Sequence, residues 1–337
     1  MTLHVRSTPT ATWLIALLAL LCGTFLLSLK SGAFPIDWST FFQVLSGSGD
    51  PSAMEKSVLW QIRMPRLLMA LATGGALAVG GVVMQAMFRN PLAEPGLMGV
   101  SAGAALGAVS GMLTGLVFSW QVGFVAFIGA GLAMMVSYVF GRRFQGAASL
   151  LLAGVAVNAL CMSLVSFLLS WSADPVLRNF VFWTMGSLSS AGWGVTAWLV
   201  PWSILMSMLV WMQWRSLNAL LLGEREAHHL GFHVARLRGR LLLSVALLVG
   251  PVVAFTGGIA FVGLLVPHMV RMCTGASHRA LLLLAWLGGG WMLLIADWIA
   301  RTAIQPAELP VGVITSLVGA PFFLWLLRRN ASVNSQA

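Results

Sequence analysis

Few side chains in this sequence could carry out bond chemistry, and their spacing does not build a catalytic centre. The three cysteines lie in or beside apolar runs, without the spacing of a metal or redox site, so we interpret them as small buried side chains. His228 and His229 are adjacent and would point apart on a helix, which disfavours a shared metal ion. No Walker A, Gly-x-Ser-x-Gly or His-Glu-x-x-His motif is present. We predict that this chain is not an enzyme and binds no metal or cofactor.

One tract does combine charge, glycine and proline at spacings that a membrane protein can use. Arg63 and Arg66 are three residues apart and would share a helix face. A glycine-rich apolar run follows, and then the polar turn RNPLAEP at residues 89–95. Pro95 suits the first turn of a helix, and Glu94 would lie at that helix's positive end. A helix cap explains these last two residues but leaves the rest of the turn unexplained.

A second set of polar residues lies nearer the C-terminus. Asp297 precedes Arg301 by one helical turn, so we expect the two to form an i,i+4 ion pair. Asp297 is the only acid within the apolar runs, which is too few for a proton or sodium relay. For the intramembrane His268 we favour a structural hydrogen bond over a functional role. Arg178 either attracts an anionic substrate or pairs with Asp174.

The composition indicates an all-α membrane protein. Of the 337 residues, 59% are hydrophobic and 8% are charged, and the mean hydropathy is +0.91. A soluble domain carries about a quarter charged residues, so most of this surface must face lipid. The apolar runs are continuous and do not alternate, which excludes a transmembrane barrel. The net charge of +10 comes from arginines between the runs, as expected for a membrane protein rather than a nucleic-acid-binding one.

We predict a single polytopic domain over residues 1–337. About ten runs approach the ~20 residues needed to cross a bilayer. Their predicted ranges are 12–29, 65–84, 95–113, 122–140, 148–169, 193–211, 241–255, 258–272, 280–299 and 310–327. A short amphipathic piece is predicted at 176–185, and a polar segment at about 215–240 separates the sixth and seventh helices.

The charge distribution predicts the orientation. With both termini inside, thirteen of the nineteen Lys and Arg residues lie on the cytoplasmic side and six on the outer side. The positive-inside rule therefore favours an N-in/C-in topology. The second span and its turn weakly echo the seventh and eighth, which predicts an inverted pseudo-repeat.

Several long, ordered motifs resemble one family. They are RMPR at 63–66, GALAVGGVVMQAMFRNPLAEPGLMGVSAGA at 75–104, GGIAFVG at 257–263, ADWIAR at 296–301 and AELPVG at 307–312. This pattern is similar to the FecCD family, the transmembrane permease subunits of type II ABC importers for cobalamin, heme and ferric siderophores. The resemblance covers nearly the whole chain beyond about residue 55.

The resemblance implies contacts with two kinds of partner. Arg63, Arg66 and Arg301 would bind glutamates of a periplasmic substrate-binding protein, because guanidinium groups grip carboxylates in a bidentate manner. A short helix in the polar segment would seat in a groove of an ATPase subunit. From its composition alone, that segment could equally be a solvated linker. The residues that match the coupling pattern are Gly223, Glu224, Arg225, Glu226, Ala227, Leu230 and Gly231.

The resemblance also implies a pathway and an inner gate. The gate would involve the Asn90–Leu92 turn and the loop before the fifth helix, where this chain has Gly-Ala-Ala at 146–148 and some relatives have hydroxyl residues. The residues that we predict along the pathway or at the gate are Met84, Gln85, Met87, Asn90, Leu92, Ala147, Ala148 and Arg178.

Together these features predict a permease subunit that imports an iron complex across the inner (plasma) membrane of a bacterium. Heme is favoured, then a ferric siderophore, then cobalamin. The predicted partners are a second copy of the chain, two ATPase subunits that use ATP and Mg²⁺, a periplasmic binding protein and membrane lipid, with no nucleic acid. The alternative is an ion-coupled secondary carrier, and the missing acidic relay argues against it.

Overall fold

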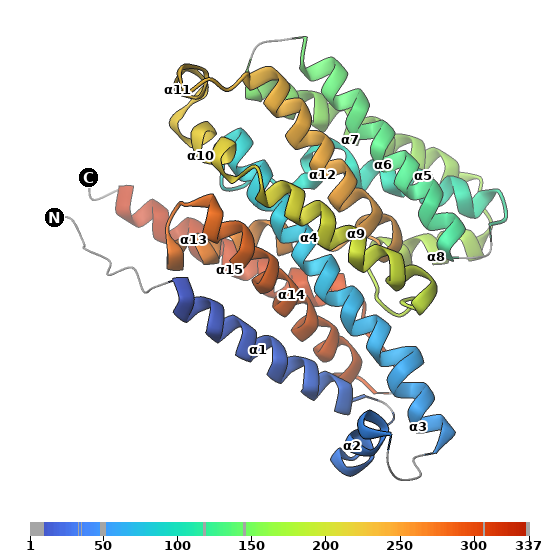
Figure 1. The fold of residues 1–337 in the computed structure, drawn as a ribbon. Helices are drawn as coiled ribbons and strands as arrows, with labels where there is room; N and C mark the ends of the chain where they lie inside the picture. The colour runs from blue at the N-terminus through green and yellow to red at the C-terminus, as the bar shows by residue number, and fades with distance from the viewer. Residues whose placement is uncertain are drawn as a thin grey trace.

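The structure is a computed structural model that describes residues 10–32, 34, 36–47, 52–116, 119–143, 146–305 and 307–334. Within these ranges all regular structure is helical, and the long helices run in roughly one common direction (Figure 1). Helices satisfy their backbone hydrogen bonds internally, as a chain must in lipid. The predicted all-α membrane fold is therefore confirmed.

Ten apolar helices carry the fold, as predicted. By length and composition, seven segments of the described chain are suited to cross a membrane, and three further apolar helices are shorter. The seven contain α1 (Thr10–Lys30), α4 (Met64–Phe88), α6 (Ser119–Gly141), α7 (Ala147–Ser170), α9 (Trp193–Trp211), α12 (Val234–Thr256) and α14 (His278–Thr302). The three shorter ones are α5 (Val100–Leu113), α13 (Val262–Thr274) and the apolar part of α15 (Val311–Asn334).

Shorter elements connect these helices. Before α4 come α2 (Trp38–Ser46), α3 (Ala53–Ser57) and the π-helical turn η1 (Val58–Arg63), and after it the 3₁₀ turn η2 (Pro95–Met98). The remaining connectors are α8 (Asp174–Thr184), α10 (Trp214–Leu222) and α11 (Glu224–His229). The last two lie in the predicted polar segment, and α8 overlaps the predicted amphipathic piece.

Several predicted boundaries were wrong: the helix expected at 258–272 begins only at Val262, and the one expected to end at 327 continues to Asn334. Two further differences have a clear local cause. The span expected to begin at 95 is divided, because Gly99 has a φ of 92° and separates η2 from α5. The span expected to begin at 241 starts instead at Val234, since three arginines that we assigned to the loop extend α12 by seven residues. Arginine is a good helix former, so a polar tract of this kind can continue a helix.

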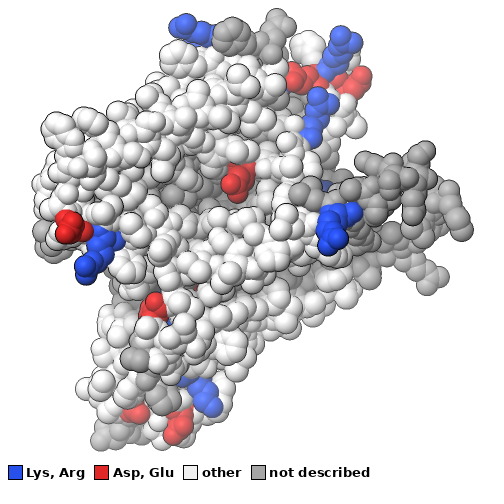
Figure 2. Space-filling view, turned by 180° about the vertical axis from the view of Figure 1, so that it is seen from behind, with Lys and Arg blue, Asp and Glu red and all other residues white. Residues whose placement is uncertain are grey.

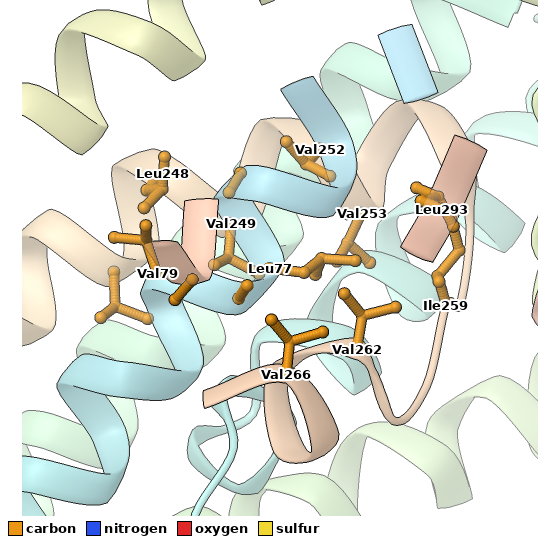
Figure 3. Close-up of a cluster of buried hydrophobic side chains, with 14 of the residues drawn as sticks. Leu77, Val79, Leu248, Val249, Val252, Val253, Ile259, Val262, Val266 and Leu293 are labelled. Carbon is orange, nitrogen blue, oxygen red and sulfur yellow. The ribbon is translucent and has the colours of Figure 1, made fainter. Parts of the chain in front are cut away.

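The core surrounds α4, which lies in the middle of the ribbon (Figure 1). It packs against α9, α12, α13 and α14. Side chains from α4, α12, α13, α14 and the α12–α13 connection meet in one cluster, shown in Figure 3: Leu77, Val79, Leu248, Val249, Val252, Val253, Ile259, Val262, Val266 and Leu293. Glycines allow the backbones to approach closely, because a Cβ at Gly74 would lie 2.1 Å from the Gly289 carbonyl oxygen.

The bundle has two distinct ends. The start of α1, the end of α15 and the pair α10–α11 lie toward one end, and α2, α3 and α8 lie toward the other (Figure 1). Figure 2 shows a largely uncharged face, most of whose charged side chains lie near its ends, as expected for a chain that spans a membrane. We call the end with α10 and α11 the coupling end, and the end with α2, α3 and α8 the arginine end. Their assignment to cytoplasm and exterior, and the inverted repeat, stay predictions.

Candidate functional site

A buried ion network ties α4 to α14 at the arginine end. The Asp297 carboxylate is fully buried and accepts from Arg66 Nε at 2.8 Å and from Arg301 Nε at 2.9 Å. The predicted Asp297–Arg301 pair is thus confirmed. Arg66 Nη1 also donates to Glu308 at 2.9 Å, and Arg301 Nη1 donates to the Ser31 carbonyl at 3.1 Å. One acid therefore positions two guanidinium groups from different helices.

Arg63 belongs to the same end but has different partners. Its guanidinium donates to the carbonyl oxygens of Leu29 and Lys30, the last two residues of α1, and of Phe34 just beyond that helix. Buried carbonyls need donors, and this side chain supplies them. Arg63 therefore fixes the connection after α1 to the start of α4.

These three arginines are predicted to dock a binding protein, and the structure shows them engaged within the chain. Arg63, Arg66 and Arg301 are 5%, 6% and 7% exposed. The sequence interpretation did not assign their neighbour Glu308, although its side chain is 44% exposed and pairs with Arg66. The sequence did offer a signal for Glu308, because this acid lies two residues before Pro310 in the AELPVG motif that resembles the family. The docking role itself stays a prediction.

The predicted coupling segment forms the hairpin of α10 and α11. Gly223 separates the two helices with a φ of 114°, a conformation that favours glycine. Ala227 is fully buried, and Glu224 pairs with Arg238 of α12. The remaining predicted residues lie at the surface: Arg225, Glu226, Leu230 and Gly231. The hairpin is thus anchored on one side and presents a mixed polar and apolar face on the other.

Two contacts join this hairpin to the bundle. The buried His278 at the start of α14 contacts Asn218 of α10, whose Oδ1 lies 2.8 Å from the ring Nδ1 and accepts from the His278 backbone N–H at 3.0 Å. Arg89 at the end of α4 reaches Gly223, where a Cβ would lie 3.6 Å from the arginine Nη1. Sequence reasoning assigned no role to the first pair, because the two residues are sixty positions apart.

The predicted gate turn begins at the coupling end of α4. Arg89 ends the helix in a left-handed conformation with a φ of 47°. Asn90 Oδ1 then accepts from the Leu92 N–H at 2.9 Å, which is an Asx turn. The Leu92 side chain is 43% exposed. The turn is therefore rigid in its backbone and offers an apolar side chain at the surface, next to the coupling hairpin.

A cavity of about 900 Å³ opens beside this turn. Its walls come from α4, η2, α5, α7, α8, α12 and α15 and from the residues around the start of α13, and they are mainly apolar. Glu94 lies in the wall. It is the N-cap residue of η2 and Pro95 begins that turn, as predicted, but the Glu94 side chain makes no capping hydrogen bond. Burial raises the pKa of its carboxyl group. Asn158 of α7 also lines the cavity and donates to the Gly96 carbonyl at 3.0 Å. The sequence interpretation assigned Asn158 no role, although a strongly polar residue within an apolar span indicates a buried polar contact.

The predicted pathway residues on α4 are not in this cavity. Met84, Gln85 and Met87 are 0%, 2% and 3% exposed and pack within the chain. Gln85 donates to the carbonyl of Gly263 at 3.3 Å and accepts from Arg271 at 3.1 Å. These three residues therefore do not line the cavity, and Gln85 joins α4 to α13. Their role along the pathway stays a prediction.

The other predicted residues lie apart from one another. Arg178 is exposed on α8, outside the cavity wall, and forms no ion pair with Asp174 among the described residues. Ala148 is exposed at the start of α7, and the side chain of Ala147 lies outside the described residues. His268 is partly buried on α13, and the described residues give its side chain no hydrogen bond.

Comparison with known proteins shows which proteins this chain is similar to. The model of the FecCD transport family matches residues 18–329. The hemin transport system permease protein HmuU of Yersinia pestis is 48% identical over 288 residues, which cover 82% of this chain and 85% of that protein. The vitamin B12 import system permease protein BtuC of Klebsiella pneumoniae is 39% identical over 331 residues, which cover 97% and 96%. A solved metal-chelate type ABC transporter in an inward-facing conformation superposes with a TM-score of 0.83 at 32% identity, over 95% of this chain and 99% of that one.

Proposed function

Because the chain belongs to the FecCD transport family, it is a permease subunit of the type II ABC importers, and we propose that its substrate is hemin. The observation that carries the substrate is the 48% identity with the hemin permease, compared with 39% for the vitamin B12 permease. The membrane would be the inner membrane of a bacterium. The chain is a transport subunit, and the energy would come from ATP hydrolysis on separate ATPase subunits.

The cavity supports a large, flat and mostly apolar substrate. Its walls include Trp183, Met162 and Met185, and its polar groups are few. A porphyrin presents broad apolar faces, and an apolar pocket with few polar groups suits such a ligand. Cobalamin is the second candidate, since its permease aligns over 97% of this chain.

The exposed face of α11 would bind the ATPase. Arg225, Glu226 and Leu230 are exposed there, and the anchored Ala227 and Glu224 fix the hairpin behind them. ATP binding would shift the balance between inward- and outward-open states through contacts that differ between those states. A second copy of the chain would cover α7, where Leu152 and Leu160 are 76% and 59% exposed.

The arginine network would dock the binding protein by exchange of carboxylates. Glu308 is the partly exposed partner of the buried Arg66. A glutamate of the binding protein would replace Glu308 in this ion pair, so the buried Arg66 would never be left without a carboxylate. We therefore expect Glu308→Gln to tighten docking severalfold, because the incoming carboxylate then meets no competitor. Asp174→Asn on α8 is the matched control, since it removes an exposed acid at the same end. Weaker or unchanged docking of Glu308→Gln would contradict this exchange.

Uptake into proteoliposomes tests the substrate. The chain is reconstituted with its ATPase and binding protein, and ATP-driven accumulation of hemin and of cyanocobalamin is measured side by side. We expect hemin uptake to require ATP and the binding protein and to exceed cobalamin uptake at least tenfold, which is about 1.4 kcal/mol of discrimination. Preferential cobalamin uptake would replace the proposed substrate, and uptake driven by an ion gradient without the ATPase would overturn the proposed energy source.

A further inference from the structure

A second cavity, separate from the proposed pathway, lies between α6 and α12 at the coupling end. Its volume is about 840 Å³. Toward the middle of the bundle its wall is apolar, with Phe127, Met135, Leu243 and Leu247. Met135 and Leu243 are 63% and 60% exposed, so the groove is open along the side of the bundle. On a chain that spans a membrane, such a side groove faces lipid.

The mouth of this groove is basic. Arg236 and Arg240 are four residues apart, so they share one face of α12, and both line the groove and are exposed. Neither forms an ion pair with the described residues, whereas Arg238 lies outside the groove lining and pairs with Glu224. No acidic side chain lines the cavity. The mouth therefore carries positive charge with no counterion from the described part of the chain.

The polar and apolar parts follow one another along α12, with the arginines before Leu243 and Leu247. The arginines occupy the first two turns of α12, and Tyr138 lies near the matching end of α6. Gly239 admits this tyrosine, because a Cβ there would lie 2.6 Å from the phenol oxygen. Tyrosine and arginine at the end of a membrane helix mark the level of lipid headgroups. A charged mouth at headgroup level above an apolar groove matches the two halves of a phospholipid.

We propose that this groove is a binding site for an anionic phospholipid. Arg236 and Arg240 hold the phosphate, as basic pockets between transmembrane helices do, and an acyl chain covers Met135 and Leu243. The connection at 231–233, which follows the coupling hairpin, forms part of the same wall. A bound lipid thus fixes the junction between the hairpin and α12.

Native mass spectrometry of the full-length chain in detergent tests the site. Phosphatidylglycerol and phosphatidylcholine with identical acyl chains are added at equal concentration. We expect tighter binding of phosphatidylglycerol, and we expect Arg236→Gln with Arg240→Gln to weaken it about thirtyfold, since each arginine contributes on the order of 1 kcal/mol to an anionic headgroup. Arg215→Gln with Arg279→Gln removes the same charge from exposed arginines near the coupling hairpin and should leave the preference intact.

A second variant tests the apolar half. Leu243→Trp keeps every charge but fills the groove, so we expect weaker binding of both lipids, whereas glycerol phosphate should not compete with phosphatidylglycerol in the wild-type chain. Size-exclusion chromatography confirms that each variant remains folded. Equal binding of the two lipids, or equal losses in the two double variants, would overturn the proposal. So would loss of ATPase binding in Arg236→Gln with Arg240→Gln without any change in lipid binding, which would assign the groove to the ATPase interface.

Discussion

α4 and α7 are apolar helices of similar length, with 25 and 24 residues, but their surroundings differ. The apolar window in the segment that contains α4 is 89% buried by the chain itself, and that of α7 is 28% buried. α4 packs mainly against α9, α10, α12, α13 and α14, whereas α7 contacts mainly α5, α6 and η2. Mean apolarity therefore does not distinguish a helix at the centre of the bundle from one at its edge.

Small residues account for the difference. α4 carries glycines on more than one face, and two of them bring a neighbouring backbone close: a Cβ at Gly74 would lie 2.1 Å from the Gly289 oxygen, and a Cβ at Gly81 would lie 1.8 Å from the Gly263 oxygen. α7 presents leucines and other large side chains at exposed positions instead. A helix that packs on all sides needs small residues, and a helix at the edge does not.

The largest expected effect comes from filling one of these contacts. Gly81→Ala places a methyl group against a backbone carbonyl that no side-chain rotation can move. We therefore expect the free energy of unfolding to fall by more than about 3 kcal/mol and little folded protein to be recovered. Gly131→Ala on α6 is the control, because nothing lies within 4 Å of its Cβ position. Folded yield by size-exclusion chromatography measures both. Equal yields would show that α4 is not closely packed.

Removal of the buried acid between α4 and α14 comes next. Asp297→Asn leaves the buried Arg301 without a carboxylate and Arg66 with only the half-exposed Glu308, which should lower the free energy of unfolding by about 3–5 kcal/mol. Glu308→Gln removes a half-exposed partner and should change it by less than about 1 kcal/mol. Unfolding in mixed micelles compares the two, and similar losses would contradict the central role of Asp297.

A direct comparison of the two helices uses one substitution on each. Leu67→Ala on α4 removes a side chain that is 1% exposed and should cost about 3 kcal/mol through the cavity that it leaves. Leu152→Ala on α7, where the side chain is 76% exposed, should stay within about 0.5 kcal/mol. The same unfolding assay in the isolated chain measures both. A large loss at Leu152 would mean that α7 is already covered.

The smallest expected effect concerns the cavity that α7 borders. The raised pKa of Glu94 means that the folded state favours the neutral acid, so stability falls as the pH rises from the unfolded value of about 4.3 to the higher folded value. The side chain of Glu94→Gln stays neutral at every pH. The free energy of unfolding of this variant should therefore exceed that of the wild type by about 1 kcal/mol above that pH window and by less below it. Melting temperatures across pH 4–8 measure this difference, and a constant offset would refute it.

Most of the helices could be predicted from the sequence, because apolar length and turn residues specify them. The range 193–211 was predicted to the residue. The faces of α4 could not be predicted, since a helix built of small apolar residues has no polar face to orient it. For that reason the burial of Met84 and Gln85 within the chain could not be read from the sequence.

Local contacts of the site were predictable and distant ones were not. The pair of Asp297 and Arg301 follows from helical spacing. The addition of Arg66 from 231 positions away, and the contact of Asn218 with His278, depend on which helices pack together. Sequence spacing contains no such information, so the sharing of one carboxylate by α4 and α14 emerged only from the structure.

α14 joins the two ends of the molecule without a break. It contacts α10 through His278 at its first residue and holds the arginine network through Asp297 near its last turn. Its 25 residues contain no proline and span about 37 Å at 1.5 Å per residue. We therefore expect a displacement of the coupling hairpin that preserves the Asn218 contact to reach the shared carboxylate at the arginine end.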